Sequence, residues 1–222
     1  MPQREPGQLD ENMVAELVRR NVVTDTFRRL PTGKKARLYR VSIRLFGEYG
    51  YDGLAIDQLC DEAGISKGSF FQYFPSKTHL LEFAILMFDR YLDGWVTEIR
   101  QHEQAVLARD RLLHLYRSVV VNSILYEAEE KFYLFVTRAL QHAAVALVGI
   151  DFERHFNDYI TEIIRRGEET GEIRGDFDID TTAHLVALVI GGLVGIKFGG
   201  STVPRRQAED YLVSFLFDGI KA

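Results

Sequence analysis

The sequence has one cysteine, five prolines and no apolar run long enough to cross a bilayer. Because Cys60 stands alone, no disulfide can form within the chain, which fits a reducing compartment. The longest apolar run, Ala183–Phe198, is interrupted by His184 and Lys197 and falls short of the ~20 residues that a membrane helix needs. The first residues, MPQREPGQLDENM, are polar and lack the apolar core of a secretory signal. We therefore expect a cytoplasmic protein without a membrane partner.

Motifs of common enzyme classes are missing as well. The sequence contains no G-x-x-x-x-G-K-[ST] loop, no G-x-S-x-G elbow and no H-E-x-x-H pair. Its six histidines share no metal-ligand spacing. Asp176, Asp178 and Asp180 resemble the start of a calcium loop, but Thr181 and Ala187 stand where the loop needs Gly and Glu. We expect no enzyme, no metal site and no cofactor.

Charge is distributed unevenly along the chain. The net charge is −5, yet residues 1–80 carry twelve basic and ten acidic side chains, whereas residues 81–222 carry fifteen and twenty-two. Between Arg28 and Gly50, seven basic residues stand against Glu48 alone. A local basic face on an acidic protein suits a surface that contacts phosphates at a specific place. The alternative is an ordinary solvated helix face.

Hydrophobic periodicity predicts an all-α protein. Leu38, Val41, Leu45, Phe46 and Tyr49 repeat at three and four residues and form one apolar stripe, with the basic residues mostly off it. The predicted helices cover Glu11–Arg20, Lys34–Tyr49, Ile56–Ala63, Lys67–Tyr73, Ser76–Ile99, Glu103–Tyr126, Glu129–Leu147, Asp151–Thr170, Thr181–Phe198 and Pro204–Ile220.

Two of these helices are short and are joined by a glycine. Gly64 can adopt the left-handed conformation of a tight turn, Ser66 is a good N-cap, and Pro75 ends the second helix at about Tyr73. This is the plan of a helix-turn-helix, in which the second helix enters the major groove of DNA. Lys67 and Ser69 suit phosphates, and Gln72 suits an adenine edge.

The stretch Arg37–Leu81 resembles the TetR (tetracycline-repressor-like) family of transcriptional regulators. The resemblance rests on LF-x-x-x-GY at Leu45–Tyr51, I-x-x-L-C-x-x-A-G at Ile56–Gly64 and SKGSFFQYFPSK at Ser66–Lys77. It implies an N-terminal three-helix DNA-binding domain and a C-terminal helical domain that binds a ligand and dimerises. Together with the basic segment, it implies that double-stranded operator DNA is contacted by Lys34, Lys67, Gly68, Ser69, Phe71, Gln72, Tyr73 and Lys77.

Three positions, at two places in the sequence, depart from the family pattern. Leu54-Ala55 stands where Thr-Ser is usual, which removes a helix N-cap typically worth ~1 kcal/mol, and Phe71 stands where Tyr is usual. We predict three regions: an extension at residues 1–31, the helix-turn-helix domain at 32–79 and an effector and dimerisation domain at 80–222. Two interpretations of the extension are open. In one, Phe27 and Leu30 pack on the domain while Arg28 and Arg29 reach the DNA backbone, and in the other the extension is disordered.

The C-terminal half contains a ridge of small residues at four-residue spacing. Three glycines in a helix each cost about 1 kcal/mol relative to alanine, so close packing of another helix should explain them. We predict a homodimer interface, with intrachain packing as the alternative. Its residues would be Ala187, Gly191, Gly195, Gly199, Tyr211 and Phe215.

Aromatic side chains on predicted core faces are candidates for contact with a small apolar or aromatic effector, although plain core packing is the alternative for each. They are Phe88, Tyr91, Trp95, Tyr116, Tyr126, Phe135, His142, Phe152 and His184. The preferred hypothesis is a homodimeric repressor that such a ligand releases from its operator. Because of the departures at Leu54, Ala55 and Phe71, a helical ligand-binding or scaffold protein with vestigial DNA affinity is the alternative.

Overall fold

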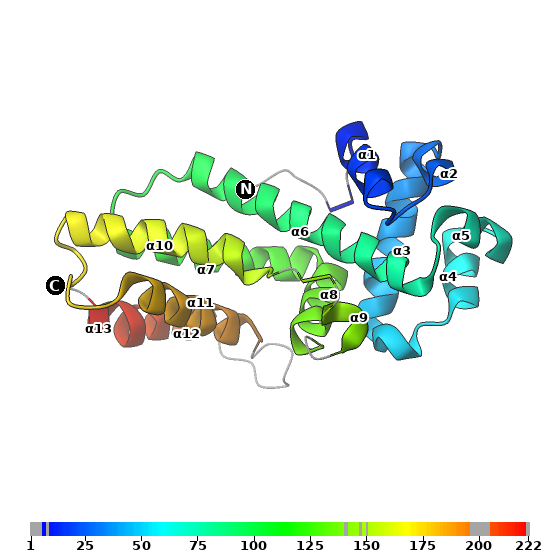
Figure 1. Cartoon of the computed structure of the whole chain (residues 1–222). Coiled ribbons are helices and arrows are strands. Elements are labelled where there is room, and N and C mark those ends of the chain that lie inside the picture. Colours follow the sequence, from blue (N-terminus) through cyan, green and yellow to red (C-terminus); the bar gives the residue numbers. More distant parts are fainter. Residues whose placement is uncertain are drawn as a thin grey trace. The chain divides into compact units, whose positions relative to one another are not determined.

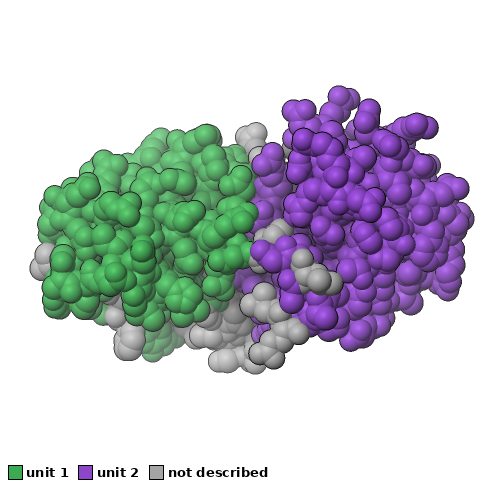
Figure 2. Space-filling view, in the orientation of Figure 1, with its two compact units in different colours: residues 1–2, 93–125, 151–222 green, residues 3–92, 126–150 purple. Residues whose placement is uncertain are grey.

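All regular elements in the described part of the chain are helices (Figure 1), so the predicted all-α fold class is confirmed. The computed structural model describes residues 6–7, 9–139, 142–146, 148–149, 151–195 and 205–220. The chain divides into two compact units, coloured separately in Figure 2: unit 1 comprises residues 1–2, 93–125 and 151–222, and unit 2 comprises residues 3–92 and 126–150. Among the described residues, no helix has the length and apolar character to cross a membrane.

Unit 2 contains the N-terminal helices and a helical pair from the middle of the chain. Its elements are α1 (Glu11–Arg19), α2 (Asp25–Arg28), α3 (Thr32–Gly53), α4 (Ile56–Ala63), α5 (Lys67–Tyr73), α8 (Glu127–Arg138) and α9 (Ala143–Ala146), with α6 (Lys77–His102) divided between the units at Asp93. Asp10 caps α1 by accepting the Met13 N–H at 2.7 Å. Gly50, with φ of 68°, interrupts α3 where the sequence predicts the end of a helix.

Two aromatic clusters form the core of unit 2. Phe27, Phe70, Phe74 and Phe83 join α2, α5 and α6, with ring centroids 5.2–5.6 Å apart. A second cluster places Phe132 of α8 between rings of α3 and α6. At this second cluster α3 and α8 pack so closely that a Cβ added to Gly47 would lie 2.9 Å from the Phe132 backbone nitrogen. These contacts hold α5 and the start of α6 in fixed positions.

Unit 1 is a bundle in which α10 packs on α11 and α7 contacts both. Besides the last part of α6, its elements are α7 (Ala108–Leu125), α10 (Glu153–Glu169), α11 (Ile179–Gly195), α12 (Arg205–Tyr211), a π-helical segment (Leu212–Phe217) and α13 (Asp218–Ile220). Gly167 of α10 is a close-packing position, because an added Cβ would lie 2.7 Å from Ile173 Cδ1. Gly171, with φ of 75°, follows the end of α10, as the sequence predicts.

Three predicted helices differ from the structure, and the last of them, predicted over Pro204–Ile220, contains the π-helical segment Leu212–Phe217. The helix predicted from Glu103 begins at Ala108, because the Glu103 carboxylate accepts the Ala105 N–H and the Glu172 carboxylate accepts the Ala108 N–H at 2.8 Å. The helix predicted over Glu129–Leu147 ends at Arg138 and resumes at Ala143, where the His142 ring accepts the Ala144 N–H at 3.2 Å. Pro204, the predicted start of the last helix, lies outside the described residues.

Candidate nucleic-acid interface

The turn between α4 and α5 has the geometry of a helix-turn-helix (Figure 1). Gly64 has φ of 68° and ψ of 43°, and its N–H and that of Ile65 bond to carbonyls of the last turn of α4 at 3.2 and 2.9 Å. Ser66 then caps α5 by accepting the Ser69 N–H at 3.1 Å. A non-glycine residue at position 64 would be strained in this left-handed conformation. The predicted bounds of both helices are therefore confirmed.

The two faces of α5 differ in chemistry. Phe70, and Phe74 just after the helix, are fully buried, as expected for core residues. The opposite face is open: Lys67, Gly68, Phe71 and Gln72 are exposed, and Ser69 and Tyr73 are half-buried. Phe71 is the unusual member, because 49% of this large apolar side chain is exposed. The six α5 residues predicted to contact DNA thus share a surface that the fold leaves accessible.

Lys67 is paired in the free protein. Its Nζ lies 2.8 Å from Oδ1 of Asp57, at the start of α4, and both side chains are exposed. The hydrogen bond to the Asp57 carboxylate raises the pKa of Lys67. Asp57 therefore places a negative charge at the edge of the surface and competes with any phosphate for the lysine.

Lys77 has protein partners as well. Its Nζ donates to the Leu54 carbonyl at 2.7 Å and lies 4.8 Å from the centre of the Tyr51 ring. Partial burial lowers the pKa of this lysine. The Tyr51 and Thr78 hydroxyls are 2.8 Å apart, which adds a second link between the residues before α4 and the start of α6. Lys77 thus anchors the loop before α4, and its contact with DNA stays a prediction.

The basic residues of α3 do not form one solvent-exposed surface, because some of them bond to other residues of the protein. Lys34 is exposed in the first turn of α3. Arg37 donates through Nε and Nη2 to the Glu62 carbonyl at 3.2 and 2.9 Å, so it caps the end of α4. Arg44 forms ion pairs with Glu48 and Glu62. Arg37 and Arg44 therefore hold α3 and α4 together, a role that charge counting alone does not reveal.

Thr24 holds the end of α5, a role that the sequence argument missed. Its N–H donates to the Tyr73 carbonyl at 3.1 Å, and its hydroxyl donates to the Gln72 carbonyl. The same hydroxyl accepts the Phe27 N–H and caps α2. The sequence holds a signal for the cap of α2, because threonine followed by aspartate is typical of a helix N-terminus, but none for the contact with α5.

The predicted ligand residues are divided between the two units. In unit 2, Phe88 and Tyr91 are buried, and Tyr91 makes an edge contact with Tyr126 at 6.2 Å between centroids. Phe135 stacks on Phe46, and His142 contacts Tyr51 and Asp52 beside α4. In unit 1, Trp95, Tyr116 and Phe152 are buried, whereas His184 is exposed. The structure thus brings together Phe88, Tyr91 and Tyr126, and a ligand role for any of the nine stays a prediction.

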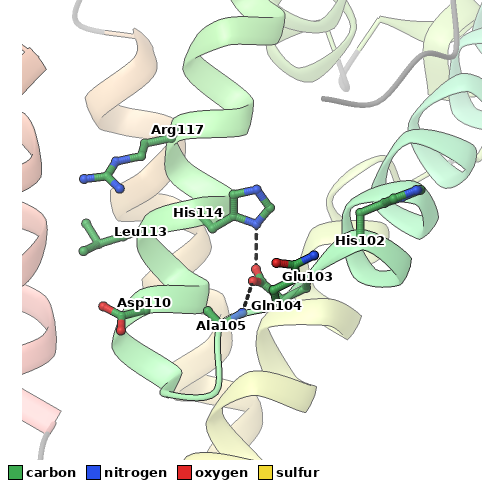
Figure 3. A pocket seen from close by; sticks show the side chains of 8 residues that line it. All are labelled: His102, Glu103, Gln104, Ala105, Asp110, Leu113, His114 and Arg117. Carbon is green, nitrogen blue, oxygen red and sulfur yellow. Dashed lines mark hydrogen bonds and ion pairs between the residues drawn. The ribbon is translucent and has the colours of Figure 1, made fainter.

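A cavity of about 390 Å³ lies in unit 1, and most of the residues that line it are of polar or charged type. Figure 3 shows the His114 ring directed at the Glu103 carboxylate, with Nδ1 and Oε2 2.6 Å apart. None of the nine aromatic and histidine candidates lines this cavity. Its lining residues are His102, Glu103, Gln104, Ala105, Asp110, Leu113, His114 and Arg117. Within the described residues, no cluster of three His, Cys, Asp or Glu side chains is placed to hold a metal ion.

The predicted dimer residues lie on α11 and α12 as far as the structure describes them. Gly191 is exposed, and an added Cβ would meet nothing within 4 Å. Ala187 is half-buried and Tyr211 is 49% exposed. On the same helix, Leu185 and Leu188 are 55% and 51% exposed, although both are large and apolar. Gly195 ends α11, whereas Gly199 and the Phe215 side chain lie outside the described residues.

Comparisons with known proteins agree on the class of this surface. Residues 38–84 match the family described as bacterial regulatory proteins, tetR family. The uncharacterized HTH-type transcriptional regulator YerO of Bacillus subtilis is 46% identical over 48 residues, which are 22% of this chain and 17% of that protein. The chain therefore matches less than a fifth of the length of this relative. The residues that match the family include the whole of α4 and α5.

Two further proteins are similar over most of their length. The HTH-type transcriptional repressor Rv1474c of Mycobacterium tuberculosis is 27% identical over 172 residues, which cover 74% of this chain and 82% of that protein. The crystal structure of a regulator from Saccharomonospora viridis in complex with choline superposes with a TM-score of 0.69 at 24% identity, covering 84% of this chain and 96% of that one. Its likeness shows the fold.

Proposed function

Because the chain belongs to the tetR family of bacterial regulatory proteins, we propose that it is a transcriptional regulator that binds double-stranded operator DNA through α5. One observation carries the proposal: Gly64 and Ser66 hold α5 so that Phe70 is buried while the opposite face is accessible. An α-helix of this kind fits the major groove, where each base pair presents a distinct pattern of donors and acceptors. The activity is binding, without catalysis or a cofactor.

The exposed face of α5 offers contacts of two kinds. Gln72 can pair with an adenine edge, and the exposed Phe71 ring suits the methyl group of thymine. Lys67 and Ser69 suit phosphates, and Gly68 and Tyr73 border the same face. Lys34, in the first turn of α3, suits a phosphate as well. Few side chains are placed to read bases, so much of the affinity should come from phosphates.

We further propose that the regulator is a homodimer whose subunits meet at α11. The support is an apolar face that the described residues leave exposed, formed by Leu185, Leu188 and Gly191. A symmetric dimer would place two copies of α5 on half-sites about 34 Å apart, or a multiple of this distance. Half-site spacing would then contribute to specificity.

We also propose that a small apolar or aromatic ligand releases the protein from its operator. The support is an aromatic cluster in which the buried Phe88 and Tyr91 of α6, the helix directly after the helix-turn-helix, meet the half-buried Tyr126. A ligand that binds one position of α6 more tightly than another would shift the population between binding-competent and released forms. In this scheme the protein acts as a repressor.

The experiment is salt-dependent binding to DNA fragments from the upstream region of the protein's own gene. We expect binding at low salt. The logarithm of the binding constant should fall linearly with the logarithm of the salt concentration. Gln72→Ala should weaken binding to the preferred fragment more than binding to scrambled DNA, because it removes a contact with a base. Arg165→Ala, at an exposed position of α10, serves as a control that leaves both unchanged.

If no genomic fragment shifts at low salt, the proposal fails, and the alternative of a helical ligand-binding or scaffold protein with vestigial DNA affinity is supported. If fragments bind but Gln72→Ala weakens all of them equally, DNA binding stands while the assignment of base reading to α5 fails.

A further inference from the structure

Residues before the helix-turn-helix are fixed to α5 by backbone hydrogen bonds. Thr24 donates its N–H to the Tyr73 carbonyl at 3.1 Å and its hydroxyl to the Gln72 carbonyl. Carbonyls at the end of a helix lack partners within the helix, so these bonds supply donors to two carbonyls in the last turn of α5. The start of α2 is thereby placed at the end of α5.

Packing fixes α2 in the same position. Phe27 is fully buried and its ring lies 5.4 Å from Phe74 and 5.2 Å from Phe83. Just before α2, Val22 and Val23 are buried as well, and Arg20 pairs with Glu82 of α6. The N-terminal extension from Asp10 onward is therefore an ordered part of unit 2, and of the two interpretations of its sequence, packing is the one the structure supports.

The outer side of this packed segment is basic. Arg28, Arg29 and Lys34 are exposed, and no acidic residue occurs between Asp25 and Glu48. Arg28 has only a distant pair with Asp25, at 3.9 Å between well-exposed groups, which contributes little. Within the described part of the chain, the side chains of Arg29 and Lys34 have no hydrogen bond or ion pair, whereas their backbone N–H groups are bonded. They differ in this from Arg37 and Arg44, whose guanidinium groups hold α3 and α4 together.

The position of these charges relative to α5 suggests their partner. With a rise of ~1.5 Å per helical residue, Arg28 and Arg29 lie roughly 6–8 Å along the chain from Thr24 at the end of α5. A helix in the major groove, about 12 Å wide, has phosphates on both walls. Side chains at this distance from the end of such a helix are close enough to reach one wall.

We propose that α2 and the first turn of α3 form a second DNA-contacting surface, in which Arg28, Arg29 and Lys34 bind phosphates beside the half-site that α5 reads. This rests on the proposed DNA-binding function and extends it, since it assigns to the N-terminal extension a share of the affinity that carries no base specificity. An acidic protein segment is the competing partner for such a basic surface. DNA is favoured because the surface is continuous with α5 through Thr24.

The test compares two double substitutions that remove the same charge. R28A/R29A removes the proposed contacts, and R165A/R166A removes two exposed arginines from α10 in unit 1. Binding to the preferred fragment is measured over a range of salt concentrations. Each phosphate contact contributes ~0.9 to the salt slope, so R28A/R29A should lower the slope by about 2 for each bound half-site. R165A/R166A should leave it at the wild-type value.

Two further readouts exclude simpler explanations. R28K/R29K keeps the positive charges and should restore most of the slope, which a purely structural role of the arginines would not predict. Hydroxyl-radical footprinting should lose protected phosphates at the edge of the half-site in R28A/R29A, with protection under α5 unchanged. Circular dichroism checks that each variant is folded.

The outcomes separate the two proposals. If the wild-type protein binds DNA and Gln72→Ala weakens binding, but R28A/R29A keeps the wild-type slope and footprint, the second surface is refuted and the proposed function stands. If R28A/R29A and R165A/R166A reduce the slope equally, the effect is one of net charge, and the second surface is again refuted. If the wild-type protein binds no DNA at low salt, both proposals fail.

Discussion

At the scale of single residues, the pair between Asp57 and Lys67 limits the grip of the proposed interface. In the free protein the Asp57 carboxylate holds the lysine at 2.8 Å and lies on the edge that would approach DNA. Asp57→Asn should therefore raise DNA affinity by roughly fivefold, the factor given by about 1 kcal/mol for two charges 4 Å apart in water. The affinities of the variant and of the wild-type protein are measured by fluorescence anisotropy at two salt concentrations.

Asp61→Asn is the matched control, because Asp61 is exposed on the same helix and loses the same charge. It should raise affinity much less than Asp57→Asn. Equal gains from the two variants would mean that only net charge matters and that the pair with Lys67 has no part in binding.

Ala55 leaves the start of α4 without a side-chain cap. Ala55→Ser would supply a hydroxyl acceptor for the free N–H groups of the first turn, whereas Ala55→Val would not. We expect Ala55→Ser to raise the free energy of unfolding by about 1 kcal/mol in urea denaturation. Ala55→Val should give no gain, and an equal gain from both would point to side-chain packing as the cause.

Glu129 of α8 gives the stability of unit 2 a pH dependence. Burial raises its pKa above the ordinary 4.5, although Arg40 opposes this shift. A carboxyl whose folded pKa is raised contributes stability below its unfolded pKa, and this contribution is lost as the pH rises through the folded pKa. Glu129→Gln should therefore gain stability relative to wild type between pH 4.5 and pH 7. A difference independent of pH, in urea denaturation at both values, would contradict this.

At the scale of helices, the sequence predicted those elements whose ends are set by local chemistry. The left-handed Gly64, the Ser66 cap and Pro75 are sufficient to predict where α4 ends and where α5 begins and ends, and the predicted bounds are confirmed. The start of α7 depends instead on Glu172, which lies 64 residues away in the sequence and caps Ala108. Hydrophobic periodicity carries no information about such a distant cap, so the helix was predicted five residues too early.

The same distinction applies to the candidate site. Exposure of Lys67, Gly68, Phe71 and Gln72 follows from helical periodicity around the buried Phe70, and could be predicted. The partners of Lys77 and Arg37 could not, because both are backbone carbonyls on other elements. The role of Thr24 depends on tertiary contact with α5 in the same way.

Close packing of α3 on α8 gives a prediction at this scale. Gly47→Ala would place a Cβ 2.9 Å from the backbone nitrogen of Phe132, which cannot move as a flexible side chain could. Overpacking of this kind typically costs 1–3 kcal/mol, more than the roughly 1 kcal/mol that alanine gains over glycine in a helix. Gly33→Ala, on the same helix with nothing within 4 Å, is the control and should not destabilise. Urea denaturation of both variants decides between packing and helix propensity.

At the scale of the whole molecule, the proposed regulator needs two copies of α5 held at a fixed spacing. The face of α11 that would join the copies exposes Leu185 and Leu188, so two charges placed there should block association. We expect L185E/L188E to elute with the mass of one 25.4-kDa chain in gel filtration with light scattering, and the wild-type protein with twice that mass. Val106→Glu, at a 74% exposed apolar position outside α11, is the control and should remain dimeric.

Loss of the dimer should then appear as loss of operator affinity. Linking two binding modules raises affinity by roughly 10²–10⁴-fold over one module, so the L185E/L188E monomer should bind its operator weaker by about that factor. Its affinity for a single half-site should equal that of the wild-type protein, because α4 and α5 fold within unit 2 and the substitutions lie in unit 1. A monomer that keeps full operator affinity would show that one copy of the α5 surface, together with Arg28 and Arg29 beside it, is sufficient for recognition.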